Sequence, residues 1–240
     1  MEREILGSGM AARSVNRSLL AAQIVGMVLV FGAVLFLPAG TLRWPGAWAF
    51  LFLMFGFTIA GSVWLLRFNP DLLAERMTGV GRRDQAGWDK TLLIVVAIAF
   101  FAWFVGMALD AVRFHWSREP PWLQVAGGFL LTISFVVFYW TARANPYLSP
   151  AVRIQSDRGH TVVSTGPYRF VRHPMYAGFA LYVFGTALLL GSYWGLAGGV
   201  VLIVLVARRA VLEEGELLRG LEGYDAYMRR VRYRLIPGVW

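Results

Sequence analysis

Five apolar blocks alternate with polar segments along the chain. The blocks cover residues 18–37, 46–66, 91–109, 122–142 and 175–207. Each of the first four has about the length that crosses a hydrocarbon core of ~30 Å as a helix. The pattern therefore predicts a polytopic membrane protein of the all-α class.

The fifth block is too long for one span, because a helix of its length would extend ~50 Å at ~1.5 Å per residue. Its middle, residues 191–195, reads GSYWG, which combines turn-forming glycines with aromatic residues typical of a membrane interface. We predict two helices joined by a tight turn there. The total is then about six transmembrane helices, and the last two form a C-terminal helical hairpin.

The basic residues fall mainly on one side of this six-span arrangement. Residues 1–17, 67–90 and 142–174 and the tail from 208 onward carry 20 of the 23 Lys and Arg, and the three opposite segments carry the other three. Since cytoplasmic segments of membrane proteins are enriched in Lys and Arg, both termini are predicted to be cytoplasmic. A single span in the fifth block would place the tail, with its seven arginines, outside, which the same rule disfavours.

Composition agrees with a membrane location and narrows the chemistry. The chain is 58% hydrophobic and 15% charged, against ~45–50% and ~25% in soluble domains. The net charge of +9 comes from arginines between apolar blocks, so membrane topology explains it and no nucleic-acid partner is expected. The lack of cysteine excludes disulfides and cysteine-ligated metals, and the three scattered histidines predict no metal site.

A polar segment with candidate chemistry, residues 166–178, precedes the hairpin and reads GPYRFVRHPMYAG. Pro174 suits the first turn of a helix, which places His173 near its N-cap. The first-turn N–H groups and the helix dipole favour a carboxylate or phosphate at this position. Arg169 and Arg172 add positive charge, so the segment predicts an anion-binding helix N-terminus.

The hairpin is expected to bring two more charged side chains to this segment. Arg209 and Glu213 are four residues apart on the returning helix and share a face. The length of the hairpin returns them beside His173 and Tyr176, where an acid and a base can bind a zwitterion or a charged ligand. Taken singly, each residue also has a structural explanation. Arg209 can determine membrane topology, Glu213 can lie on a solvated face, and His173 can anchor the helix at the interface. The functional and the structural interpretations therefore both stay open.

These patterns divide the chain into two predicted parts. Residues 1–144, with four spans, form an N-terminal transmembrane scaffold. Residues 145–240, built from a loop, the hairpin and a basic tail, are expected to carry the function. The tail interleaves tyrosines with arginines, which predicts a segment lying on anionic lipid, a lid over the site, or both.

Three motifs of the second part stand out together. They are HTVVSTGPYRFVRHPMYAG at residues 160–178, the R-x-x-x-E pair Arg209/Glu213, and the pattern Y-x-x-Y-x-x-x-V-x-Y-R-x-I-P at residues 224–237. In these motifs the chain resembles the isoprenylcysteine carboxyl methyltransferase family of integral membrane enzymes. The resemblance implies S-adenosylmethionine as methyl donor, bound on the cytoplasmic side without a Rossmann domain, and the chain has no GxGxxG motif after a strand.

The resemblance also implies the site residues. The cofactor pocket would be formed by His160, Thr161, Val162, Val163, Tyr168, His173, Pro174, Met175, Tyr176 and Glu213. Arg209 matches the position that handles the acceptor's carboxylate. If the acceptor were an amine or a thiol, the reaction would need a base, for which Glu214 and His173 are the candidates.

The acceptor is expected to be lipophilic or small, with an isoprenylcysteine-type carboxylate first by resemblance. A phospholipid amine and a small thiol stay open. Two other classes compete with a methyltransferase. One is a membrane sterol-type reductase, which has a similar C-terminal half but uses NADPH, and the other is a non-enzymatic membrane protein whose basic tail recruits lipid or a partner.

Overall fold

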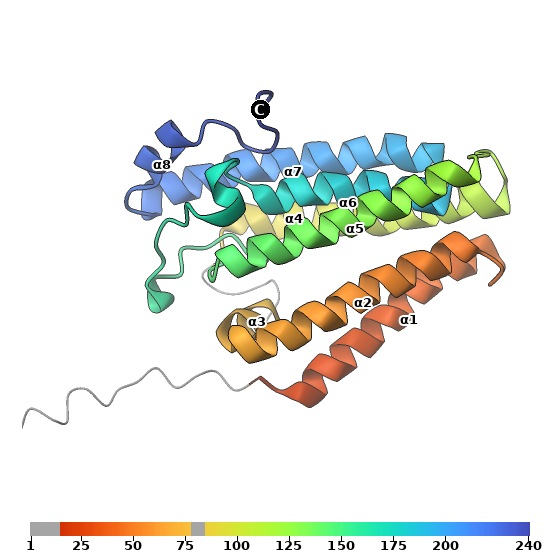
Figure 1. The fold of residues 1–240 in the computed structure, drawn as a ribbon, viewed down its shortest axis with the longest axis horizontal. Helices are drawn as coiled ribbons and strands as arrows, with labels where there is room; N and C mark the ends of the chain where they lie inside the picture. The colour runs from red at the N-terminus through yellow and green to blue at the C-terminus, as the bar shows by residue number, and fades with distance from the viewer. Residues whose placement is uncertain (1–14, 78–84) are drawn as a thin grey trace, which may run out of the picture.

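The computed structural model describes residues 15–77 and 85–240, and helices dominate this part of the chain (Figure 1). Five of its helices are long and apolar enough to cross a membrane, and α6, with 17 residues, is a shorter apolar helix. The predicted all-α, polytopic architecture is confirmed. Residues 1–14 and 78–84, which belong to predicted cytoplasmic segments, lie outside the described residues. The helices are α1 (Arg17–Ala39), α2 (Pro45–Phe68), α3 (Pro70–Met77), α4 (Gly87–Ala108), α5 (Pro121–Ala144), α6 (Pro174–Leu190), α7 (Tyr193–Gly220) and α8 (Tyr224–Arg230).

The predicted break in the fifth apolar block is confirmed between α6 and α7. Gly191 has a φ of 78°, a left-handed conformation that favours glycine, and its N–H caps the last carbonyls of α6. Ser192 then begins α7, because its hydroxyl accepts the N–H of Gly195 at 2.8 Å. The two helices run back along each other as a hairpin.

Helices α4 to α7 lie side by side, and α1 and α2 form a pair against them (Figure 1). The helices α5 and α6 approach closely at Gly127 and Gly185, where a Cβ on either residue would overlap the backbone of the other helix. An aromatic cluster of Phe31, Phe50 and Phe104 joins α1, α2 and α4, with ring centroids 5.2–6.2 Å apart. Helix α5 of the first part packs along α6 of the second, and the functional division near residue 144 stays a prediction.

One end of the bundle collects the irregular segments: residues 145–173, the short helices α3 and α8, and the C-terminal tail (Figure 1). The tail is tied to the start of α6, since the N–H groups of Arg172 and His173 donate to the carbonyls of Tyr233 and Arg234, each at 2.9 Å. The two parts of the sequence with candidate chemistry are thus held together at one end.

At the opposite end a buried carboxylate joins two loops. Asp110 lies in the π-helical turn Leu109–Arg113 and accepts the N–H of Ser117 at 2.9 Å and its hydroxyl at 2.6 Å. Its Oδ2 also accepts the hydroxyl of Ser192 at 2.5 Å. Asp110 lies just after the end of α4, and its side chain is buried among these hydroxyl groups.

Candidate functional site

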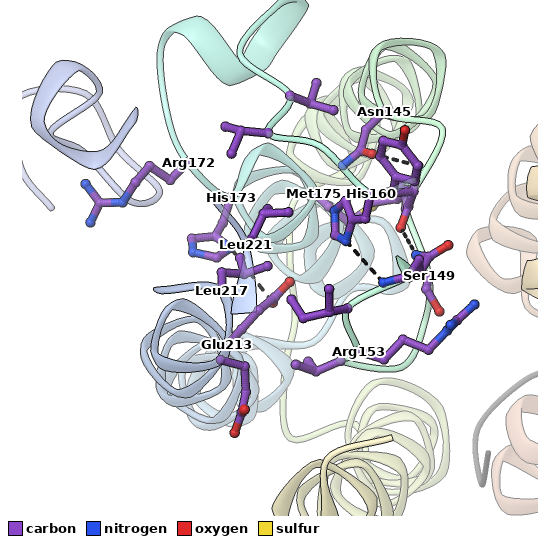
Figure 2. Close-up of a pocket in the computed structure, with 18 of the residues that line it drawn as sticks. Asn145, Ser149, Arg153, His160, Arg172, His173, Met175, Glu213, Leu217 and Leu221 are labelled. Atoms are coloured by element: carbon purple, nitrogen blue, oxygen red, sulfur yellow. Dashed lines mark hydrogen bonds and ion pairs between the residues drawn. The ribbon is translucent and has the colours of Figure 1, made fainter. Parts of the chain in front are cut away.

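A cavity lies at the end of the bundle that carries the irregular segments (Figure 2). It has a volume of ≈ 220 Å³ and opens to the surface. Ligand pockets typically measure ~300–1,000 Å³, so a nucleoside-sized molecule would also occupy the open mouth. Eleven of the twelve predicted site residues line it: His160, Thr161, Val162, Val163, Tyr168, His173, Pro174, Met175, Tyr176, Arg209 and Glu213. Their roles in binding stay predictions.

The first turn of α6 forms one wall of the cavity. His173 occupies the N-cap and Pro174 the first helical position, as the sequence predicted. The imidazole of His173 stacks on the ring of Tyr176, with centroids 5.4 Å apart and planes at 9°. A flat aromatic surface therefore lies next to the partly positive end of a helix.

A hydrogen-bonded network joins α6 to α7 at this wall. The hydroxyl of Tyr176 donates to Oε2 of Glu213 at 2.6 Å and accepts from Nη1 of Arg209 at 2.7 Å. Nδ1 of His173 lies 3.9 Å from the same Glu213 oxygen. The predicted meeting of these four side chains is confirmed. The Glu213 side chain remains 25% exposed, so a ligand in the cavity can reach it.

The groups that fix Arg209 were missed by the sequence analysis. Nε of Arg209 donates to Oδ1 of Asp89 at 2.8 Å, and Nη2 donates to the carbonyl of Pro150 at 2.7 Å. The other Asp89 oxygen accepts the N–H of Val152 at 2.9 Å, and Asp89 is fully buried. In the sequence Asp89 precedes an apolar block like an ordinary boundary residue, and no spacing relates it to Arg209.

The surroundings of Glu214 do not suit the general base that the sequence analysis considered. Its Oε1 accepts Nε of Arg172 at 2.6 Å and lies 3.2 Å from Nε2 of His173, and its Oε2 accepts Nε of Arg234 at 2.8 Å. Glu214 is 3% exposed and is not among the described residues that line the cavity. Arg172 also donates from Nη1 to the carbonyls of Val231 and Arg232 in the tail, at 2.8 and 2.7 Å. We therefore correct this expectation: the three nitrogen groups stabilise a charged carboxylate that holds the start of α6 against the tail.

The loop after α5 forms the wall opposite the hairpin. Gln155 is 1% exposed, and its Nε2 donates to the carbonyl of Tyr147 at 2.6 Å. The backbone N–H of Gln155 donates to Nδ1 of His160 at 3.3 Å, which leaves the ring proton on Nε2. Burial lowers the pKa of His160, and the charges of Arg153 and Arg158 lower it further. His160 is accordingly neutral at physiological pH.

A second buried ion pair fixes this loop to α3. Arg153 donates from Nη2 and Nε to the two oxygens of Glu75, at 3.1 and 3.2 Å. Both side chains are at most 2% exposed, and a two-point contact of this kind holds both partners in one orientation. The pairs Arg153–Glu75 and Arg209–Asp89 show that the first part of the chain contributes to the walls of the site.

Three tyrosines close the cavity near α8. The Tyr168 hydroxyl accepts Nδ2 of Asn145 at 2.8 Å, and its carbonyl accepts the hydroxyl of Tyr227 at 2.7 Å. Burial raises the pKa of Tyr168, Tyr224 and Tyr227 above the usual value for tyrosine. The phenols are neutral, and neutral tyrosine rings attract a cation through their faces.

Comparisons with known proteins point to the same region of the chain. Residues 122–221, which include the hairpin and most of the cavity wall, match a model of the phospholipid methyltransferases. The protein-S-isoprenylcysteine O-methyltransferase of Schizosaccharomyces pombe is 26% identical over 201 residues, covering 76% of this chain and 85% of that protein.

The fold and these matches define a multi-pass integral membrane methyltransferase, of a kind whose members use S-adenosylmethionine as methyl donor. Within that class, the chain is similar to the membrane methyltransferases that include the phospholipid and isoprenylcysteine enzymes. The resemblance drawn from residues 160–178, which include the RHP segment (residues 172–174), from the Arg209/Glu213 pair and from the tail is confirmed. Neither match supports the sterol-type reductase or the non-enzymatic alternative.

Proposed function

We propose that this protein methylates the carboxylate of a lipophilic acceptor of the isoprenylcysteine type, with its cavity on the cytoplasmic side. The observation that carries the proposal is the Arg209–Tyr176–Glu213 network at the cavity wall. It places a fixed cation and an accessible carboxylate on either side of one tyrosine hydroxyl, which suits an anionic acceptor beside a zwitterionic cofactor. The name of the fission yeast relative supports the acceptor class.

The cavity suits S-adenosylmethionine in shape and charge. Val162, Val163, Leu217 and Leu221 line it with apolar surface that fits an adenine ring. The tyrosine rings suit a sulfonium cation, and the start of α6 suits the ligand's carboxylate. Glu213 is placed to pair with its amino group or a ribose hydroxyl. The cofactor supplies an electrophilic methyl group, and the protein acts mainly by holding the two reactants in line and away from water.

Arg209 favours an anionic acceptor. Three of its five N–H donors contact Asp89, Tyr176 and Pro150, which fixes the guanidinium and leaves donors for a ligand carboxylate. A carboxylate is a nucleophile in its charged form, so its methylation requires no general base. This agrees with the enclosure of Glu214 among positively charged groups.

A second acceptor class, the amine of a phospholipid, is favoured by the family model that matches residues 122–221. An amine must lose a proton before or during methyl transfer, so this reaction requires a base. Glu213 and His173 both line the cavity, and either side chain could accept this proton.

The test is methyl transfer by the purified protein in lipid nanodiscs, with methyl-labelled S-adenosylmethionine and three acceptors. They are N-acetyl-S-farnesylcysteine, its carboxamide, and phosphatidylethanolamine. We expect label on the first alone, released by mild base as a methyl ester is. Base-stable label on phosphatidylethanolamine would overturn the carboxylate acceptor and support the phospholipid amine instead. No label on any acceptor would overturn the proposed acceptor.

A further inference from the structure

The contacts of Asp89 connect the first part of the chain to the cavity. We propose that Asp89 is a positioning residue that acts through Arg209 and sets the geometry of acceptor binding. The proposal rests on the function proposed above, because it concerns the orientation of the group that would receive the acceptor. It assigns a role in the reaction to the first turn of α4, which precedes the matched family region.

Asp89 divides its two oxygens between two parts of the cavity wall. Oδ1 accepts Nε of Arg209 at 2.8 Å, and Oδ2 accepts the N–H of Val152 at 2.9 Å and Nε2 of Gln85 at 2.8 Å. Arg209 and Val152 both line the cavity, whereas Asp89 is 0% exposed and stands behind them. Asp89 can therefore affect a ligand only through the groups it holds.

The charge of Asp89 matters because Arg209 has another carboxylate within reach. The Arg209 side chain is 10% exposed, and a buried guanidinium requires a counter-ion. The Tyr176 hydroxyl lies between Arg209 and Glu213, in contact with both. By neutralising Arg209 from behind, Asp89 keeps the guanidinium from turning toward Glu213. It thereby keeps Arg209 available to the acceptor and Glu213 available to the cofactor.

The substitution Asp89→Asn separates this role from a general role in stability. An asparagine oxygen can still accept the N–H of Val152, but its amide NH₂ then faces the Nε donor of Arg209. The change thus disturbs Arg209 while the loop keeps its hydrogen bond. Glu75→Gln is the matched control, since Glu75 fixes the same loop through Arg153 and makes no described contact with Arg209.

The experiment is a double-mutant cycle of Asp89→Asn and Arg209→Ala in nanodiscs. For each variant, kcat and KM are measured with N-acetyl-S-farnesylcysteine as acceptor. The Kd of S-adenosylhomocysteine and the Tm are measured as well. We expect Asp89→Asn to lower kcat/KM for the acceptor by ~10- to 100-fold, the effect of a small misplacement of a catalytic group. In the Arg209→Ala background the same change should have an effect of less than about twofold. Asp89→Glu, which keeps the charge, should recover part of the loss. Glu75→Gln should combine additively with Arg209→Ala.

Additive effects of Asp89→Asn and Arg209→Ala would overturn the proposal, as would a loss of S-adenosylhomocysteine affinity as large as the loss of turnover. If Asp89→Asn does not fold, Asp89→Glu decides. In Asp89→Glu, a raised KM for the acceptor with an unchanged Kd for S-adenosylhomocysteine supports the proposal. Equal changes in the acceptor KM and in this Kd contradict it. Failure of the proposed function has a different signature, because the wild-type protein itself would then methylate no farnesylcysteine.

Discussion

The two ends of the helical bundle both bury a carboxylate, but they stabilise it differently. At the cavity end Asp89 pairs with the guanidinium of Arg209, whose other donors reach the cavity wall. At the opposite end Asp110 accepts hydrogen bonds from Ser117 and Ser192. A fixed cation can orient an anionic ligand, whereas a carboxylate held by hydroxyl groups joins segments of the chain. Substitutions at the first end should therefore change the reaction, and those at the second should change stability.

The largest effect is expected for Arg209→Ala. Loss of the fixed cation should lower kcat for N-acetyl-S-farnesylcysteine by ~100-fold or more, because the acceptor is no longer held in line. The affinity for S-adenosylhomocysteine should change much less. The neighbouring Arg208, which is exposed, provides the control: Arg208→Ala should leave kcat unchanged. Normal turnover by Arg209→Ala would contradict the comparison, because a substitution at the cavity end would then leave the reaction unchanged.

Glu213→Ala should weaken cofactor binding by ~10-fold, the equivalent of one charge-assisted hydrogen bond. The reason is the exposure of Glu213 toward the cavity, where it can pair with a positively charged or hydroxyl group of the ligand. The measurement is the Kd of S-adenosylhomocysteine by calorimetry, with the exposed Glu222→Ala as control. An unchanged Kd would show that the cofactor site is placed wrongly in the cavity.

At the opposite end, Asp110→Asn should destabilise the protein by about 1–3 kcal/mol, because at least one hydroxyl donor loses a charged acceptor. Thermal unfolding in detergent would report this as a lower Tm. The kcat of the surviving protein should stay within about twofold of the wild type, since Asp110 lies at the far end from the cavity. A kcat loss comparable to that of Arg209→Ala would contradict the assignment of function to one end.

The smallest effect concerns pH. Burial, with the nearby charge of Asp110, raises the pKa of Glu119 from 4.5 to about 7, and neither carboxylate oxygen has a hydrogen-bond partner among the described residues. The folded protein therefore binds this proton more tightly than the unfolded chain does. Its contribution to stability is full at acidic pH and is lost as the pH rises through about 7. Glu119→Gln should raise Tm relative to wild type at pH 8 and not at pH 5. The same difference in Tm at both pH values would argue against a titrating Glu119.

Local patterns predicted the elements of the fold and the meeting of the hairpin with the RHP segment. Span length, the turn at Gly191 and Ser192, and the position of Pro174 are all encoded within a few residues. The hairpin geometry follows from helix length alone, so the approach of Arg209 to Tyr176 could be expected before any coordinates.

The contacts that cross from one part of the chain to the other were not predictable in this way. Asp89 and Arg209 are 120 residues apart, and no periodicity relates α4 to α7. Glu213 and Glu214 are neighbours in sequence, but successive residues of a helix point about 100° apart. One of them therefore faces the cavity and the other faces Arg172, a choice that depends on the rotation of α7 in the bundle.

The most direct test of the central claim is the binding of S-adenosylhomocysteine and of NADPH to the purified full-length protein. We predict micromolar affinity for S-adenosylhomocysteine, weakened in Glu213→Ala, and no saturable binding of NADPH. Binding of NADPH without S-adenosylhomocysteine, or equal affinity for S-adenosylhomocysteine in wild type and Glu213→Ala, would contradict a methyl-donor site at the Arg209–Tyr176–Glu213 network.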